Sequence, residues 1–254
     1  NQIPYYVYGN LQDGPSHRGP SNSRFGGRGI PRGAWHAVGG SEAGFAIPDP
    51  EDNNIIWSTS HPGGAIDRYD LRTGHTHQIN VWPENPLGLP DAKLKYRFYR
   101  TYPIAISPHD HNKVYVGSQY VHQTINGGNS WTIISPDLST SDKNRQQNEG
   151  GLTPMNNSNE DCALFALAES PLEEGLIWAG TNDGQVQVTR DGGTLWTNVT
   201  SNIPHLPPWG TVSNIESSRF DPGTCYITVS LHEESDRNPY VYKTNDYGKS
   251  WKSI

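Results

Sequence analysis

Short apolar runs, separated by proline, glycine and polar turns, recur along the whole of this 254-residue chain. The clearest unit is an apolar run that ends near a proline, then a short polar turn, then a run rich in β-branched and aromatic residues with a small residue close to its end. Such units lie at 44–58, 104–118, 164–181 and 219–229. No stretch has the 3.6-residue periodicity of an amphipathic helix. The pattern therefore predicts an all-β protein of short antiparallel strands.

An eight-residue pattern occurs three times, each time after two strands of such a unit. It has threonine first, asparagine or aspartate third, glycine fifth and tryptophan eighth. The copies contain Thr124, Asn126, Gly128 and Trp131; Thr189, Asp191, Gly193 and Trp196; and Thr244, Asp246, Gly248 and Trp251. An Asp or Asn side chain accepts hydrogen bonds from backbone N–H groups of a turn, glycine allows positive φ, and tryptophan packs between sheets. These residues are therefore assigned to the architecture and not to a reaction.

Together the two patterns predict a β-propeller of four-stranded antiparallel blades, with strands A to D in order and the eight-residue repeat between C and D. Complete blades are expected at about 41–82, 96–137, 161–200 and 211–254, after an incomplete blade at 1–40 that lacks strand A. About four and three-quarter blades are thus present, and we expect them to be part of a larger propeller. A compact ring of four or five blades is the alternative. Because an open ring leaves sheet edges exposed, the missing blades or another subunit are expected as partners.

The composition excludes several functions. A formal net charge of −7 gives no electrostatic footprint for nucleic acid or an anionic membrane. No apolar run approaches the roughly 20 residues of a membrane-spanning helix. The chain starts at Asn1 without methionine or a signal peptide, so the start is expected to be processed or internal. Cys162 and Cys225 lie in strand-like runs and are expected to be buried thiols, with one bridge between adjacent blades left open.

On these repeats the chain resembles the Asp-box (BNR-type) propeller proteins, which include sialidases, tandem-propeller xyloglucanases, sortilin-type receptors and a photosystem II assembly factor. It is most similar to large bacterial secreted proteins described as sortilin-like or "glycosyl hydrolase" repeat proteins, through segments 168–172, 178–181, 187–193 and 240–251. The resemblance implies a propeller that is secreted, periplasmic or at the cell surface. It implies no catalytic residue, because the matching segments are the repeats themselves.

Strand order assigns the loops to two faces of the propeller. The A–B and C–D turns share one face, and the B–C and D–A connections share the other. The long connections, at 82–96, 135–161, 199–211 and 231–239, all fall on the second face, which we call the long-loop face. Long loops on a rigid scaffold usually carry binding or catalysis, so candidate residues are sought there.

The acidic candidates on the long-loop face are Asp13, Glu42, Asp161 and Asp183. Glycoside hydrolysis needs two carboxylates about 5 to 9.5 Å apart. Two of the four precede glycine in a turn, where aspartate commonly caps the backbone, and a turn role is favoured for them.

The candidate binding residues are Trp82, Tyr96, Arg97, Tyr99, Arg100 and Trp209. Aromatic rings on such loops stack on sugars or anchor a partner protein, and burial against the neighbouring blade is an equal alternative. No metal site and no cofactor is predicted.

Two functions follow from these candidates. The first is an extracytoplasmic interaction scaffold that binds a protein, peptide or glycan through the long-loop face. The alternative is an Asp-box-type glycoside hydrolase that acts on a polysaccharide. A hydrolase requires two facing carboxylates with shifted pKa values in an open cleft, whereas a scaffold requires an apolar or aromatic patch without such a pair.

Overall fold

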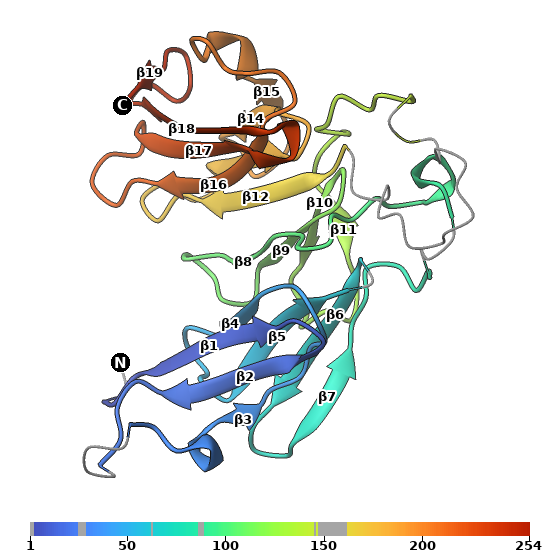
Figure 1. The fold of residues 1–254 in the computed structure, drawn as a ribbon, viewed down its shortest axis with the longest axis vertical. Coiled ribbons are helices and arrows are strands. Elements are labelled where there is room, and N and C mark those ends of the chain that lie inside the picture. The colour runs from blue at the N-terminus through green and yellow to red at the C-terminus, as the bar shows by residue number, and fades with distance from the viewer. Residues whose placement is uncertain (1–2, 25–28, 62, 86–88, 145, 147–161) are drawn as a thin grey trace.

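Five antiparallel sheets follow one another along the chain in the computed structural model (Figure 1). The structure describes residues 3–24, 29–61, 63–85, 89–144, 146 and 162–254. The first sheet contains β1 (Tyr6–Leu11), β2 (Gly14–Pro20) and β3 (His36–Ala37), and the second contains β4 (Ala46–Pro48), β5 (Ile55–Ser60), β6 (Ala65–Asp70) and β7 (His75–Gln78). The third contains β8 (Ile104–Ile106), β9 (Val114–Gly117), β10 (Val121–Thr124) and β11 (Thr132–Ile133). The fourth contains β12 (Leu164–Glu169), β13 (Ile177–Thr181), β14 (Val186–Thr189) and β15 (Trp196–Asn198), and the fifth contains β16 (Thr211–Ser217), β17 (Cys225–Leu231), β18 (Asp236–Thr244) and β19 (Lys252–Ser253).

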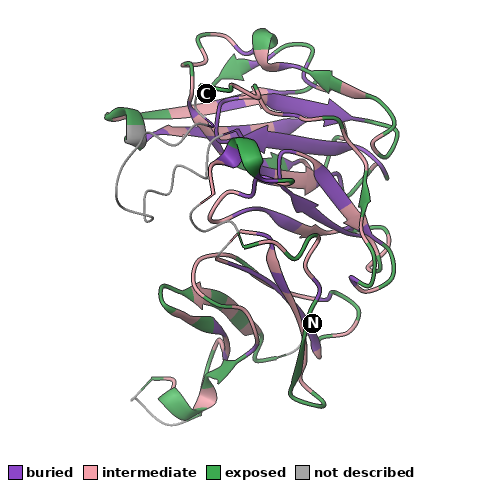
Figure 2. Cartoon of the chain, turned by 90° about the vertical axis from the view of Figure 1, so that its right-hand side faces the viewer, coloured by how far each residue is buried: buried purple, intermediate pink, exposed green. Residues whose placement is uncertain are grey.

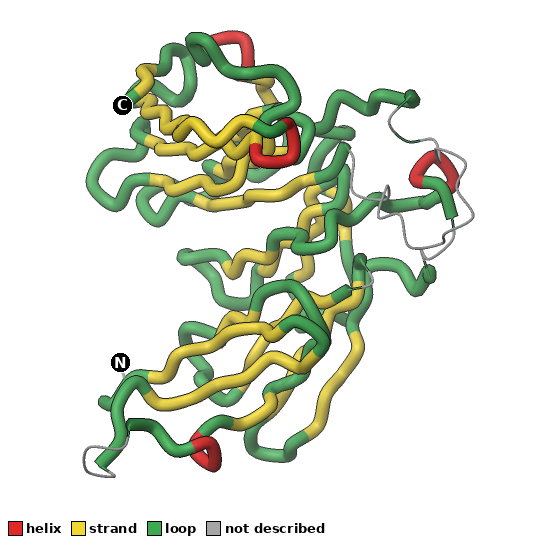
Figure 3. Tube along the Cα trace, in the orientation of Figure 1, coloured by secondary structure: helices red, strands yellow, loops and turns green. Residues whose placement is uncertain are grey.

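The predicted fold class is confirmed: one three-stranded sheet precedes four four-stranded sheets, and every pairing is antiparallel between consecutive strands. Helical structure in the described residues is limited to short 3-10 turns such as η2 (Asp91–Lys93) and η5 (His232–Glu234) (Figure 3). None of these described helices is long and apolar enough to cross a bilayer.

The sheets form an open arc and not a ring. Within each sheet the strands are consecutive, so no strand of the fifth sheet completes the first. The alternative of a compact ring of four or five blades is therefore not what the chain forms. The described parts of the connection from β7 to β8 and of the one that leaves β11 lie on the right in Figure 1, whereas the β8–β9 turn lies on the left. The described parts of these two D–A connections thus share one side, and Figure 2 looks onto that side.

Apolar side chains between neighbouring sheets make up the core (Figure 2). In the inner sheets the second strand is buried along its whole length, as in β5, β9 and β13, because a neighbouring sheet covers each of its faces. Between the fourth and fifth sheets, Trp178 and Trp251 meet edge to face with ring centroids 5.9 Å apart. Both cysteines, Cys162 and Cys225, are buried and free, which closes the disulfide alternative.

The two end sheets have unlike free faces. In the fifth sheet, alternate residues of β17 are buried apolar side chains, and the residues between them are the half-exposed Tyr226, Thr228 and Ser230. In the first sheet, Val7 and Leu11 are exposed on one face of β1, opposite the face whose Asn10 amide bonds to the second sheet. The free face of the first sheet is therefore apolar, and that of the fifth sheet is largely polar.

A tryptophan adds to the apolar face of the first sheet. Gly19 is the cross-strand partner of Val7, so a side chain at Gly19 would point to the same face. The Trp35 ring fills that space, 2.4 Å from where a Cβ would stand. Tyr5, one alternation before Val7, is 64% exposed. We call the set Tyr5, Val7, Leu11 and Trp35 the first-sheet apolar face.

The three eight-residue repeats form the turns between third and fourth strands and share one set of hydrogen bonds. In the fourth sheet, the Thr189 hydroxyl donates to Asp191 Oδ1 (2.8 Å), and the N–H of Gly193 donates to Thr189 Oγ1 (3.1 Å). The N–H of Leu195 donates to Asp191 Oδ1 (2.9 Å). The same bonds recur in the other two copies. In the turn, aspartate and threonine thus replace the backbone partners that a strand supplies.

Each repeat also contacts the sheet before it. A Cβ on Gly128 would lie 2.5 Å from Ile79, and one on Gly193 would lie 2.3 Å from the carbonyl oxygen of Ile134. The indole N–H of Trp131 donates to the Ile79 carbonyl (2.8 Å), and that of Trp196 donates to Ile134 in the same way (2.8 Å). Ile79 and Ile134 directly follow the last strands of the second and third sheets, so the repeats join neighbouring sheets.

The connection predicted at 231–239 is shorter than expected. The strands pair as far as Leu231 and Asp236, and η5 with a left-handed Ser235 (φ 61°) closes the turn. Polar residues at the start of β18 gave no strand signal in the sequence, and pairing with β17 decides their conformation.

Burial of His122 in β10 makes stability depend on pH. Its Nε2 lies 2.7 Å from Ser118 Oγ, its ring meets the Tyr96 ring at 4.7 Å, and burial lowers its pKa to about 4. An unfolded histidine titrates near 6.5, so below that pH the unfolded chain gains a proton that the folded chain does not. We expect the free energy of unfolding to fall by roughly 3 kcal/mol from this group between pH 6.5 and 4. Chemical denaturation at pH 7 and 4.5 should show a smaller fall for His122→Gln than for the wild type.

His75→Gln is the matched control, because His75 is exposed on β7. It should keep the pH dependence of the wild type. An equal pH dependence in the wild type and His122→Gln would show that His122 does not titrate as its burial implies.

Candidate functional site

Residues 95–97 cross the long-loop face on a fixed backbone. The N–H of Arg97 donates to Gln119 Oε1 (2.8 Å), and the Gln119 amide donates to the Lys95 carbonyl (3.3 Å). The Arg97 guanidinium is buried and donates to the Cys162 carbonyl (3.2 Å) and Asp137 Oδ2 (2.8 Å). Arg97, a predicted binding residue, thus anchors this segment to the third sheet and to the start of the fourth.

The next residues alternate between two neighbours. Phe98 packs on the turn between β5 and β6, where a Cβ on Gly63 would lie 2.7 Å from Phe98 Cβ, so this turn needs glycine. Tyr99, also a predicted binding residue, points the other way and meets Phe165 edge to face at 4.8 Å. Arg100 returns to the second-sheet side and pairs with Glu42 at 3.3 Å. Tyr99 and Arg100 therefore contact different parts of the chain, the fourth sheet and the connection before the second sheet.

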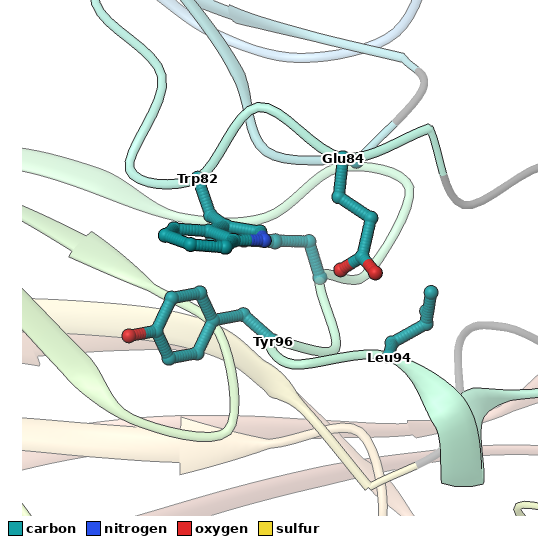
Figure 4. Close-up of a pocket in the computed structure, with 6 residues that line it drawn as sticks. Trp82, Glu84, Leu94 and Tyr96 are labelled. Carbon is teal, nitrogen blue, oxygen red and sulfur yellow. The ribbon is translucent and has the colours of Figure 1, made fainter.

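Trp82 and Tyr96 border one hollow on this face (Figure 4). Its lining is Gly63, Trp82, Glu84, Leu94, Tyr96 and Phe98. The two rings stand on opposite sides of the opening, and the Glu84 carboxylate lies beside it (Figure 4). Trp82 is 44% exposed, which is high for an indole in a lined hollow. Tyr96 rests against Tyr120 and His122, with ring centroids 6.1 and 4.7 Å away, so its position is set by the third sheet.

Asp13 and Glu42 are brought together next to Arg100. The Gln12 amide donates to both, at 3.2 Å to Asp13 Oδ1 and 2.8 Å to Glu42 Oε2. The neighbouring Glu42 carboxyl, the Gln12 amide and, more weakly, the Arg100 charge lower the pKa of Asp13. Asp13 sits in the left-handed region (φ 56°) of the β1–β2 turn. The predicted turn residue therefore also belongs to a pair of carboxyl groups.

The other two acidic candidates do not join this pair. Asp183 is buried, and its oxygens accept bonds from the Thr140 N–H (2.8 Å), the Thr140 hydroxyl (2.7 Å) and the Thr181 hydroxyl. These bonds fix the β13–β14 turn against the connection that follows β11, as a capping aspartate does. Asp161 lies outside the described residues. Trp209 stands beside Gly184 in the same region and takes no part in the hollow.

The two charged residues beside the rings, Glu84 and Lys95, were not selected from the sequence, nor were the lining residues Gly63, Leu94 and Phe98. Glu84 follows Trp82 by two positions, and Lys95 precedes Tyr96, in segments without regular periodicity. Their closeness in sequence to Trp82 and Tyr96 was the only signal that could have indicated them. An irregular connection has no periodicity that reveals which side chains share a face.

No family model matches the chain. It is similar to the oligoxyloglucan-reducing end-specific xyloglucanase of Emericella nidulans, with 25% identity over 224 residues, which cover 85% of the chain and 24% of that enzyme. The chain thus spans about a quarter of the length of this relative.

Solved structures share the fold. The GH74 xyloglucanase of Xanthomonas campestris superposes with a TM-score of 0.59 at 16% identity, over 98% of this chain and 36% of that one. The extracellular domain of BT4673 from B. thetaiotaomicron superposes with a TM-score of 0.57 at 13% identity, over 98% of this chain and 26% of that one. The chain therefore has the fold of propeller proteins that include GH74 enzymes, as the resemblance to xyloglucanases implied.

Proposed function

We propose that the chain is a β-propeller segment that binds a glycan through the hollow between Trp82 and Tyr96. The observation that carries the proposal is the exposed Trp82 ring, which faces Tyr96 across an opening with a carboxylate beside it. Aromatic faces take up the apolar C–H faces of sugar rings, and a few polar groups fix hydroxyl groups. The similarity to a xyloglucanase supports a xyloglucan-type ligand. A protein or peptide ligand has no comparable support.

An extracytoplasmic location agrees with this ligand. The similar domain of BT4673 is extracellular, and extracellular polysaccharides are available only outside the cytoplasm. We infer that the chain acts on the cell surface, in the periplasm or after secretion.

Binding without hydrolysis fits the carboxylates better than catalysis does. A glycosidase needs one carboxylic acid with a raised pKa, and a gap that accommodates the scissile bond. Here one amide group bridges Asp13 and Glu42, the pKa of Asp13 is lowered, and Glu42 is paired with Arg100. This arrangement resembles a stabilised turn more than an acid–base pair.

Truncation of Trp82 tests the binding proposal. In isothermal titration with a xyloglucan oligosaccharide, Trp82→Ala should weaken binding about tenfold, because loss of an aromatic stacking surface costs roughly 1.4 kcal/mol. Phe220→Ala is the control, since Phe220 is 95% exposed but lies in the β16–β17 turn. Equal affinity of Trp82→Ala and wild type would remove the hollow as the binding site.

The alternative function, a glycoside hydrolase, is favoured by one observation, namely the closeness of Asp13 and Glu42. We expect no release of reducing ends from xyloglucan by the wild-type chain. Release that Asp13→Asn and Glu42→Gln each abolish, with unchanged folding by circular dichroism, would establish the alternative instead.

We further infer that another blade of the same propeller covers the first-sheet apolar face. The face of β1 that carries Asn10 bonds to the second sheet, so the opposite face, which carries Val7 and Leu11, is where a further sheet would stack. A large exposed apolar face is characteristic of such an interface. The largely polar free face of the fifth sheet does not need to be buried against another sheet.

The 254-residue chain should expose this face to a hydrophobic dye. We expect ANS fluorescence to fall when Val7 and Leu11 are both replaced by lysine. It should not fall when Thr228, on the free face of the fifth sheet, is replaced by lysine. Unchanged ANS fluorescence would contradict the exposed face. A discrete dimer that the double substitution dissociates would instead assign the face to a second subunit.

A further inference from the structure

A cation from the chain itself lies against the two aromatic rings that border the hollow. The Lys95 ammonium lies 3.4 Å from the centroid of the Trp82 ring and 5.2 Å from that of the Tyr96 ring. Both distances are within the range of a cation–π interaction. The ammonium therefore covers one face of the Trp82 ring, and a sugar that stacks on that face must displace it.

The backbone places Lys95 there, and its side chain is free to leave. The Lys95 carbonyl accepts the Gln119 amide, and the Lys95 N–H donates to Glu84 Oε2 (3.3 Å). The residue as a whole is exposed. The Glu84 carboxylate and the net charge of −7 both favour a cation near the rings. The lysine is thus a tethered occupant at high effective concentration.

We infer that Lys95 is a specificity-determining residue that competes with glycans for the Trp82 ring. The inference rests on the proposed glycan-binding function. A neutral sugar must displace the ammonium and forfeit the cation–π interaction, which lowers its affinity about two- to fivefold for an exposed pair. The same penalty applies to every glycan that stacks on Trp82, so the competition favours glycans that gain their affinity from contacts beyond this ring.

The chemistry of the occupant predicts the effect of each replacement. Methionine at this position keeps the length and apolar stem of lysine without the charge, and it should raise the affinity for a neutral oligosaccharide two- to fivefold. Arginine retains a cation over the ring and should leave the affinity within twofold of the wild type.

The test titrates wild type, Lys95→Met, Lys95→Arg and Lys93→Met with a xyloglucan oligosaccharide. Lys93 is the matched control, because it is an exposed lysine two residues away in η2. A second measurement needs no sugar: acrylamide quenching of Trp82, taken as the difference between each protein and its Trp82→Phe counterpart. Quenching should increase in Lys95→Met and stay unchanged in Lys95→Arg and Lys93→Met.

The two measurements separate failure of the inference from failure of the proposed function. Equal quenching in Lys95→Met and wild type, or an equal or lower affinity in Lys95→Met when the wild type binds, overturns the inference. If quenching increases but no variant binds the oligosaccharide, Lys95 does cover Trp82 and the glycan-binding proposal falls. A gain in affinity for Lys93→Met equal to that for Lys95→Met also overturns the inference, because charge alone then explains it.

Discussion

Contact between each eight-residue repeat and the sheet before it is the constraint on which the rest of this structure depends. Glycine at the fifth position admits the end of the preceding sheet so closely that no other side chain fits at Gly128 or Gly193. The tryptophans of these two copies donate to the backbone at the same places, Ile79 and Ile134. Each repeat thus sets the shape of its own hairpin and the distance between its sheet and the preceding sheet. Sheets of short strands can therefore stack closely on one another.

The same contact positions the candidate site. Ile79, which Gly128 and Trp131 hold, lies three residues before Trp82. The indole that we propose to bind a glycan is therefore carried on a connection whose start is fixed by the third sheet. The other side of the hollow is fixed separately, by the bonds of Gln119 and Arg97. Two anchors at different places on the third sheet hold the ends of this irregular connection, so that it presents a ring to solvent.

Charge divides the long-loop face into two regions with different chemistry. Around Arg100, the carboxyl groups of Asp13 and Glu42 bind the Gln12 amide, and Glu42 also pairs with Arg100. Around Trp82, the carboxylate of Glu84 borders an opening, and the only cation there is on the flexible stem of a lysine, as far as the described residues show. A region whose polar groups satisfy one another offers little to a ligand, whereas a region with an exposed ring and a displaceable charge does.

The sequence by itself determined the strands, their grouping in fours and the incomplete first sheet, because alternation of apolar residues and the chemistry of turns act over a few neighbouring residues. It also placed Trp82 and Tyr96 in the connection between the second and third sheets. Only the tertiary structure decided that these two rings border one hollow, that Arg97 is buried, and that Asp13 joins Glu42 while Asp183 caps a turn. These outcomes depend on which segments from different sheets lie side by side, and irregular connections carry no periodicity from which that proximity follows.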